Sequence, residues 1–402
     1  MDEIGLRYLL LGLRLGRHLP GMVSSYVGPP DLAEAVAGED LTPPAELHAE
    51  AMKLADVVAE LPATTGSQRR RSAWVVGQLG AMSAIARQVG GEEIGFVDLV
   101  EELYDIEVLL EPDSTFGTAR HMLDGALPPG GSLRERLASH ERSSRIAPEH
   151  AIAAVADLAA VLRDRTRRQL WLPESESVDL QSTHGEVWDS DVHYLGSGRS
   201  VVRINLDLPV TVGAVIEYAA HACYPGHHAE AAVKDAVLVR VGHPELGLIV
   251  DLSPQAVVSE GMATFAREVV MSDQELAVEL GKLASSLGQP LDIEAELMVH
   301  RARRLMTPAL GNAAVALHRD GEPPEQVRAY LAEAALVTDE RLDGLMGYLG
   351  DPTWRTYPFT HIDGRRLVGE WLEANGQTHG YSRLLAEQMS PGHLRAELAE
   401  AR

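Results

Sequence analysis

Cysteine and aromatic residues are scarce in this chain of 402 residues. Cys223 is the only cysteine, so no disulfide can form within the chain, and we expect a reducing compartment. Aromatic residues make up 5% of the sequence, whereas alanine, leucine, valine, glutamate and arginine are abundant. This composition favours helices over strands. The sequence therefore predicts a mainly α-helical fold.

Positive charge and long apolar runs are also lacking. The formal net charge is −24, which argues against binding to nucleic acid or to an anionic membrane, because clustered cations are needed to bind phosphate groups. The one dense basic run, Arg69-Arg70-Arg71, has the pattern of a solvated helix face. No run of about twenty apolar residues occurs, and the chain begins with acids, Met1-Asp2-Glu3, where a signal peptide carries basic residues. We therefore expect a soluble, cytoplasmic protein that binds neither nucleic acid nor membrane.

Apolar residues recur with the spacing of amphipathic helices in most of the chain. In the first half this spacing predicts helices over residues 43–61, 66–89, 95–110, 133–140 and 148–169. In the second half it predicts helices over residues 212–222, 255–272 and 290–319. Residues 178–209 differ, because apolar and polar residues alternate there between glycines and aspartates. We expect a small β hairpin or sheet in that region, with a turn at 194–198 and a strand at 200–206.

Three histidines lie within eight residues in the segment His221-Ala-Cys-Tyr-Pro-Gly-His227-His228. About thirty positions later, Glu260 stands among small and apolar neighbours in Val-Val-Ser-Glu-Gly-Met-Ala. A buried carboxylate requires a cation or a metal ion beside it. Two imidazoles from one segment and a carboxylate from a following helix form the ligand set of a mononuclear zinc site. Iron and manganese accept the same set, and zinc is the default.

The spacing of the histidines leaves the second ligand open. In a regular helix, His228 returns almost to the face of His221, because seven residues make about two turns. If Pro225 and Gly226 insert a bulge of about two residues, His227 takes that place instead. The sequence therefore predicts His221, Glu260 and one of two adjacent histidines as metal ligands.

The residue after the first histidine is Ala222, although the H-E-x-x-H motif of zinc hydrolases has its catalytic glutamate there. A methyl group cannot move a proton, and loss of general-base help costs about 10²–10⁴ in rate. Glu217 and Glu230 are the nearest carboxylates in the sequence, and Tyr224 and His228 are candidates for an acid or an electrophile. Three explanations stay open: an engineered inactive variant, a natural non-hydrolytic relative, or an enzyme that uses another base.

A second polar cluster occurs near the C-terminal end, in Tyr357-Pro-Phe-Thr-His361-Ile-Asp-Gly-Arg365-Arg366. It is predicted to lie near the start of a helix. Its tyrosine, histidine or first arginine is a candidate to hold a substrate carboxylate or a developing oxyanion. The alternative is a purely structural role for this segment, as a solvated loop with a helix N-cap.

These motifs resemble those of the family labelled domain of unknown function 885, of which the chain looks like a divergent member. Members of that family carry His-Glu-x-x-Pro-Gly-His followed by a helix with Glu-Gly-x-Ala, which correspond here to the histidine segment and to Glu260-Gly261-Met262-Ala263. The resemblance extends over most of the chain, through Pro20-Gly-Met-Val-Ser-Ser-Tyr-Val-Gly-Pro-Pro30, Leu127-Pro-Pro-Gly-Gly-Ser-Leu-Arg-Glu-Arg136, Tyr194-Leu-Gly, Ile204-Asn-Leu-Asp-Leu-Pro209 and Leu252-Ser-Pro-Gln-Ala-Val-Val-Ser-Glu260.

The family in turn resembles the helical zincin metallopeptidases of the carboxypeptidase Taq kind. The resemblance implies a zincin-like helical metallohydrolase in which His221, His227 and Glu260 bind zinc, with His228 close by. Ala222 departs from it, since the family has its presumed general base at that position.

Together these observations predict a zinc-dependent hydrolase of an amide or peptide bond in a small-molecule or peptide substrate, impaired by the missing base. The alternatives are a non-hydrolytic metalloenzyme, of the lyase or cyclisation type, and a binding protein without turnover. We expect residues 1–170 to form an N-terminal helical region packed on a metal-binding catalytic region at 171–402, in one compact unit. The sequence specifies neither the substrate nor the oligomeric state.

Overall fold

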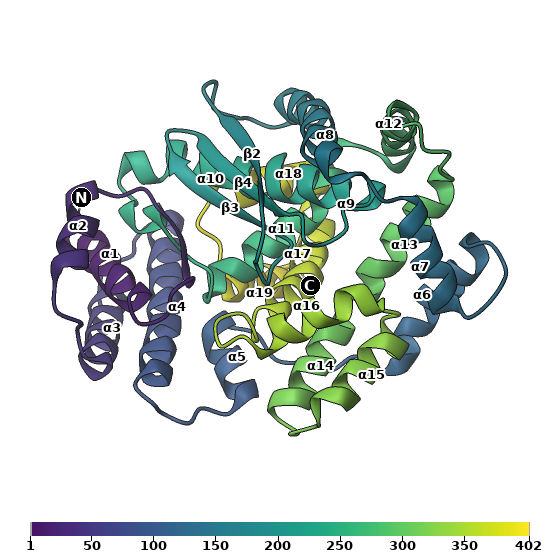
Figure 1. Cartoon of the computed structure of the whole chain (residues 1–402). Coiled ribbons are helices and arrows are strands. Elements are labelled where there is room, and N and C mark those ends of the chain that lie inside the picture. Colours follow the sequence, from purple (N-terminus) through teal and green to yellow (C-terminus); the bar gives the residue numbers. More distant parts are fainter. Residues whose placement is uncertain (1, 402) are drawn as a thin grey trace.

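A computed structural model describes residues 2–401 and shows a mainly α-helical protein with two small sheets (Figure 1). The helical fold with a small sheet that the sequence predicts is therefore confirmed. The helices of the first half are α1 Glu3–Gly16, α2 Pro30–Gly38, α3 Pro44–Ala59, α4 Gly66–Val89, α5 Phe96–Tyr104, α6 Asp113–Ala126, α7 Leu133–Ser143 and α8 Pro148–Gln169.

The second half begins with strands and then returns to helices. The short helices that follow the strands are α9 Val212–Ile216, the π-helical segment η1 Glu217–Cys223, α10 His227–Val237 and the two 3₁₀ turns η2 Val239–Val241 and η3 Pro244–Gly247. The remaining helices are α11 Pro254–Val270, α12 Asp273–Ser286, α13 Ile293–Met306, α14 Pro308–His318, α15 Pro324–Ala334, α16 Asp339–Gly350, α17 Pro358–Asn375, α18 Gln377–Ala386 and α19 Pro391–Glu400.

The predicted sheet has three strands, β2 Ser177–Thr183, β3 Ser190–Gly196 and β4 Arg199–Asn205. Strand β4 lies between the other two, antiparallel to β3 and parallel to β2. The turn expected at 194–198 begins later, because Tyr194 still pairs with Ser200 in the ladder. Ser197 and Gly198 form the turn, both with positive φ.

A second sheet was not predicted from the sequence. Strand β1 Val23–Tyr26 pairs antiparallel with β5 Leu248–Val250. These strands have four and three residues, which is too short for a strand periodicity to be recognised. Strand β1 also lies beside β3, where Ser25 Oγ accepts a hydrogen bond of 2.8 Å from the Tyr194 amide.

Most predicted helices are found within a few residues of their expected bounds, with two exceptions, of which the one over 212–222 is described with the site below. The helix expected over 290–319 is two helices, α13 and α14, which meet at Thr307 and Pro308. Proline has no backbone N–H, so the i to i−4 ladder is interrupted at Pro308 and a new helix begins with proline in its first turn.

Two large groups of buried apolar side chains form the core. One lies among the N-terminal helices, β5 and helices α14 to α17. The other joins α8 to β4, α9, η1, α10, α11 and the C-terminal helices. Apolar residues from both sides of position 170, such as Leu162 and Val215, share this second core. The division into regions at 170 remains a prediction.

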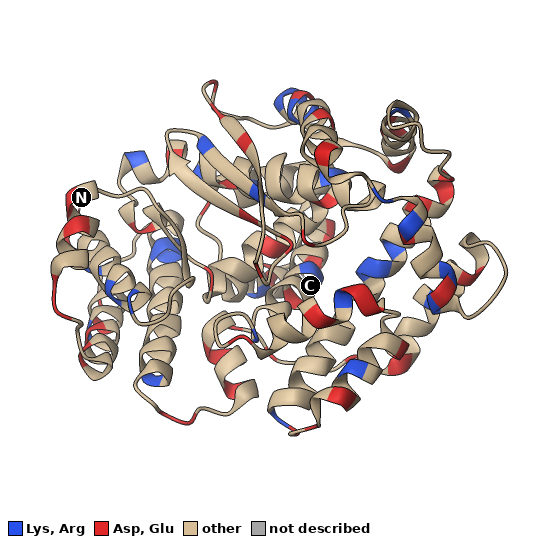
Figure 2. Ribbon diagram, in the orientation of Figure 1, with Lys and Arg blue, Asp and Glu red and all other residues tan. Residues whose placement is uncertain are grey.

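Two observations describe the outside of the molecule. Acidic and basic residues are interspersed along the helices rather than sorted onto separate elements (Figure 2). Among residues 2–401, no helix combines the length and apolar character needed to cross a bilayer.

Helices α11 and α17 approach each other at the level of their backbones. A Cβ atom on Gly261 would lie 2.3 Å from the Gly364 carbonyl oxygen, and one on Gly364 would lie 2.3 Å from the Val257 carbonyl oxygen. Backbone atoms cannot move aside as the end of a flexible side chain can. Glycine at both positions therefore sets the distance between the two helices that carry Glu260 and His361.

We expect Gly364→Ala to lower the free energy of unfolding by about 3 kcal/mol or more, at or above the upper end for overpacked cores. This loss outweighs the gain of up to about 1 kcal/mol that alanine brings to a helix interior. Gly281→Ala in α12 is the matched control, because a Cβ atom there meets nothing within 4 Å, and we expect it to be neutral or stabilising. Urea unfolding measures both, and equal stability of the two variants would contradict the close approach.

Candidate metal centre

The histidine segment is not a regular helix. The backbone widens from α9 into the π-helical segment η1, leaves the helix at Tyr224, and begins α10 at His227. Gly226 allows this return, because a Cβ atom there would lie 1.8 Å from the His221 carbonyl oxygen. The regular helix expected over 212–222 is thus found only up to Ile216. The break places His227 Nε2 3.0 Å from His221 Nε2.

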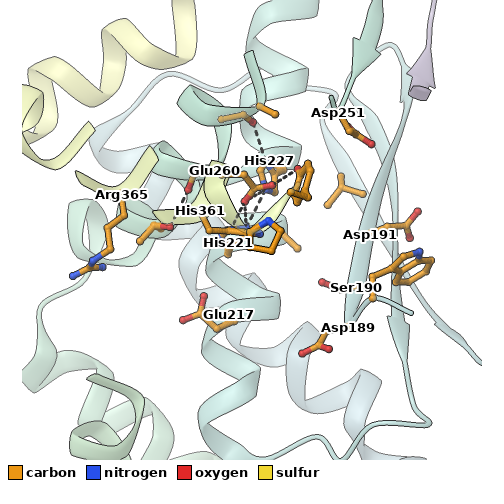
Figure 3. A pocket seen from close by; sticks show the side chains of 18 of the residues that line it. Asp189, Ser190, Asp191, Glu217, His221, His227, Asp251, Glu260, His361 and Arg365 are labelled. Atoms are coloured by element: carbon orange, nitrogen blue, oxygen red, sulfur yellow. Dashed lines mark hydrogen bonds and ion pairs between the residues drawn. The ribbon is translucent and has the colours of Figure 1, made fainter. Parts of the chain in front are cut away.

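One oxygen of Glu260 lies at the centre of a cluster of imidazole nitrogens (Figure 3). Glu260 Oε2 is 3.0 Å from His221 Nε2, 3.4 Å from His227 Nε2 and 3.0 Å from His361 Nδ1. The ligand atoms of His221, Glu260 and His361 all lie within 4.8 Å of one another. Yet Glu260 Oε2 is buried and has no hydrogen-bond partner among the described residues. Its neighbours are close but are not aligned to donate to it.

The other oxygen of Glu260 is held in place. The Tyr357 hydroxyl donates a hydrogen bond of 2.6 Å to Glu260 Oε1. Burial raises the pKa of the Glu260 carboxyl, but the neighbouring His361 and His227 hold it well below its usual range. A carboxylate is therefore fixed in one rotamer, ionised, with one free oxygen that points into the cluster.

A chain of polar groups orients His227 from behind. The Ser259 hydroxyl donates to Glu230 Oε2, so its oxygen is free to accept from His227 Nδ1 at 3.0 Å. Glu230 Oε1 in turn accepts from Lys234 Nζ at 2.5 Å. With its proton on Nδ1, His227 presents the lone pair of Nε2 to the cluster. Such outer partners fix the tautomer and direction of metal-binding histidines.

His228, the other candidate ligand, belongs to a separate buried cluster around Glu176. His228 Nε2 lies 3.2 Å from Glu176 Oε2, and the Tyr224 hydroxyl donates to the same oxygen at 2.5 Å. Arg163 and Arg167 bond to the opposite oxygen at 2.7 Å each. Neither His228 nor Tyr224 lines the cavity described below. The acid or electrophile role that the sequence suggested for these two residues does not fit this position, because Glu176 and Ser200 occupy their polar atoms.

The cluster opens into a cavity of about 1220 Å³, which is larger than most small-molecule pockets. Ala222 lines this cavity, and so does Glu217, whose Oε1 lies 3.3 Å from His300 Nε2. Burial raises the pKa of the Glu217 carboxyl, but the nearby His300 and His221 lower it by more. The net pKa is below the usual value, so the carboxyl stays ionised. Figure 3 shows Glu217 one turn below His221, in the cavity wall.

Sequence reasoning did not identify Asp251, a carboxylate of the cavity wall. Asp251 follows β5, accepts a hydrogen bond of 2.8 Å from the Ser24 hydroxyl, and lines the cavity across from the histidines. Burial raises the pKa of Asp251 to about 7. No local motif marks this residue, because its position depends on the unpredicted pairing of β1 with β5.

Helix α17 brings the second polar cluster to the same place. Tyr357, His361 and Arg365 are spaced by four residues, so they share one face of the helix, and all three line the cavity. Tyr357 and His361 contact Glu260 directly. Burial lowers the pKa of His361, but the adjacent Glu260 raises it overall. The alternative of a solvated loop is excluded for this segment.

Comparisons with known proteins show a similarity of fold alone. No family model matches the chain, and no curated protein matches it. Among solved structures, a putative lipoprotein from Colwellia psychrerythraea is 15% identical with a TM-score of 0.53, over 88% of this chain and 66% of that one. A second, of unknown function, from Shewanella oneidensis is 12% identical with a TM-score of 0.51, over 92% of this chain and 76% of that one. The protein thus spans just under two thirds of the first relative, and shares its fold.

The Glu176 cluster generates a prediction for stability. Burial raises the pKa of Glu176, but hydrogen bonds from His228, Tyr224 and Arg163 lower it to about 2. A depressed carboxyl stabilises the fold above its unfolded pKa near 4.5, and this contribution is lost as the pH falls through about 2. The shift corresponds to about 3 kcal/mol.

We therefore expect Glu176→Gln to lower the free energy of unfolding at pH 7 by about 3 kcal/mol, since it removes the buried negative charge to which Arg163 and Tyr224 donate hydrogen bonds. Below pH 4.5 the stability of the natural protein should fall toward that of the variant. Urea unfolding at several pH values measures both. Glu275→Gln is the comparison, because that carboxyl also has a pKa of about 2 but lies on the surface, and solvent weakens such pairs. A loss as large in Glu275→Gln would contradict the special role of the buried cluster.

Proposed function

We propose that the protein is a metal-dependent hydrolase of an amide or peptide bond, in which His221, His227 and Glu260 hold a zinc ion. The observation that carries the proposal is the unpartnered, buried oxygen of Glu260 among three imidazole nitrogens. An ionised oxygen without a donor is unfavourable in a protein interior. A cation at this point supplies what the oxygen lacks.

The donor set fits zinc. Two imidazole nitrogens and a carboxylate oxygen are the protein ligands of many catalytic zinc sites. His361 adds a third imidazole on the cavity side, within 3.0 Å of the same oxygen. Iron and manganese accept the same ligands, so the set does not select one metal by itself. The hydrogen-bond chain of Ser259, Glu230 and Lys234 supports metal binding. It holds the proton of His227 on Nδ1 and leaves Nε2 with a free lone pair toward the cluster.

The chemistry of the site divides between the metal and the chain. A bound zinc ion would supply Lewis-acid polarisation of a substrate carbonyl. His361 lies beside Glu260 on the cavity side and can donate a hydrogen bond to a substrate oxygen there, whereas the Tyr357 hydroxyl already donates its proton to Glu260. Glu217 faces the cavity as an ionised carboxylate and is a candidate for a base. Asp251 is a second titratable group across the cavity.

Ala222 favours a second candidate function. Its methyl group lines the cavity where a zinc hydrolase carries its general base. A metal site without that base is suited to non-hydrolytic chemistry, such as a lyase or cyclisation reaction, in which polarisation of a carbonyl suffices. The two candidates share the metal site and differ in whether water is a reactant.

Substitution of the proposed ligands tests metal binding. We expect His221→Gln and Glu260→Gln to weaken zinc binding more than about 100-fold, because each removes a ligand, and Ser259→Ala to weaken it about 10–100-fold, as for other outer partners. His227→Gln should behave as a ligand variant, and His228→Gln should bind zinc as the natural protein does. Competition with a chromophoric chelator measures all five. If His228→Gln loses zinc and His227→Gln keeps it, the ligand assignment is wrong.

The reaction class is tested at position 222. Because general-base help contributes about 10²–10⁴ in rate, we expect Ala222→Glu to raise peptide hydrolysis by that factor in the zinc-loaded protein. Ala222→Gln has the same size without a base and is the matched control. Hydrolysis of a mixture of internally quenched fluorescent peptides is the measurement. Zinc binding with no hydrolysis by any of the three proteins would reject the hydrolase and favour the non-hydrolytic candidate.

A further inference from the structure

Arg365 lines the cavity one helical turn beyond His361 and has no charged partner. Its guanidinium forms neither a hydrogen bond nor an ion pair with any residue in 2–401, and Nη1 is buried without a partner. The guanidinium lies over the ring of Phe265, whose centroid is 5.4 Å from the guanidinium carbon. Figure 3 shows the side chain extending along the cavity away from the histidines.

Other arginines of the same cavity are neutralised. Three of them bond to carboxylates, in the pairs Arg303–Glu141, Arg304–Glu268 at 2.7 Å and Arg366–Asp363 at 2.6 Å. The carboxylates whose charges act on Arg365 are Glu268 and Glu217, and these are bonded to Arg304 and His300 instead. Arg365 is therefore the cation of this wall that the protein leaves available.

An unpaired guanidinium in such a place is unfavourable unless a ligand pairs with it. Burial lowers the pKa of Arg365, which reflects the loss of water around the charge. Arginine presents a planar fork of N–H donors that matches the two oxygens of a carboxylate. The Phe265 ring supports one face of the guanidinium and leaves its edge for hydrogen bonds.

We propose that Arg365 binds a carboxylate of the substrate, next to the bond that lies at the metal site. This inference rests on the proposed function and names its substrate class. Four residues along α17 correspond to about 6 Å, and one residue of an extended peptide spans about 3.3–3.6 Å. A carboxylate held by Arg365 thus belongs to a residue one or two positions from the reacting bond. A chain-terminal carboxylate and an acidic side chain both offer this group.

Binding of matched peptides to the zinc-loaded protein tests the proposal. The probes are tetra-alanine with a free terminal carboxylate, the same peptide with an amidated end, and an amidated peptide whose last residue is glutamate. We expect at least one carboxylate-bearing peptide to bind on the order of tenfold or more tightly than the uncharged amide, since a hydrogen bond to a charged group contributes that much. The arm that gains affinity identifies the terminal or the side-chain source.

Substitutions of two neighbouring arginines test which residue causes the preference for carboxylate-bearing peptides. Arg365→Gln should abolish it and leave binding of the uncharged amide unchanged. Arg366→Gln is the control, because Arg366 is the next residue, more exposed and already paired with Asp363, and it should keep the preference. Isothermal titration calorimetry measures each affinity. A preference that survives Arg365→Gln, or no measurable binding of any peptide, would overturn the proposal.

The outcomes are separable from those of the proposed function. Zinc content is measured on each protein, and the titrations are repeated after chelator treatment, where Arg365 is still present. A protein that binds no zinc but discriminates carboxylate peptides through Arg365 contradicts the metalloenzyme and supports the subsite. A protein that binds zinc and shows no such discrimination contradicts only the subsite.

Discussion

The close approach of α11 and α17 is the constraint on which the candidate site depends. Gly261 and Gly364 face each other across the contact, where a methyl group on either would meet backbone atoms. Because the helices lie this close, Tyr357 and His361 reach Glu260 with direct contacts of 2.6 and 3.0 Å. The same contact fixes the direction of the whole α17 face, and with it the place of the arginine on the next turn. Two glycines thus join residues that are about a hundred positions apart in the sequence into one polar wall.

Adjacent histidines at the start of α10 serve two carboxylates in different ways. Successive residues of a helix point about 100° apart, so His227 faces the cavity while His228 faces the core. His228 meets Glu176, a carboxylate that is saturated by two arginines, a tyrosine and the histidine itself. Glu260 has donors on one oxygen only. The saturated carboxylate has the character of a structural anchor, whereas the half-satisfied one has the character of a binding site.

The sequence predicts the parts of this arrangement that depend on local patterns. Helical periodicity locates α4 and α8 at their observed bounds, and the histidine segment with Glu260 identifies the residues that meet in the cluster. The choice between His227 and His228 depended on how the chain passes Pro225, and periodicity carries no information about a π-helical turn followed by a break. Glu176 and Asp251 were missed because each acquires its role from partners distant in sequence. The unpaired state of Arg365 is likewise a property of the whole cavity, which no local motif records.

Ala222 separates the question of binding from the question of turnover. Ala222 is small and buried, so the absence of a base at this position leaves the proposed metal ligands in place. Two features remain that a cation would explain. Glu230, Ser259 and Lys234 form a largely buried polar chain behind His227, and one oxygen of Glu260 has no hydrogen-bond donor. Buried polar networks stabilise a fold when every member is satisfied and destabilise it when one is not. A metal ion would satisfy the free oxygen of Glu260, and on this ground metal binding, rather than catalysis, is the proposal that the surrounding structure supports most directly.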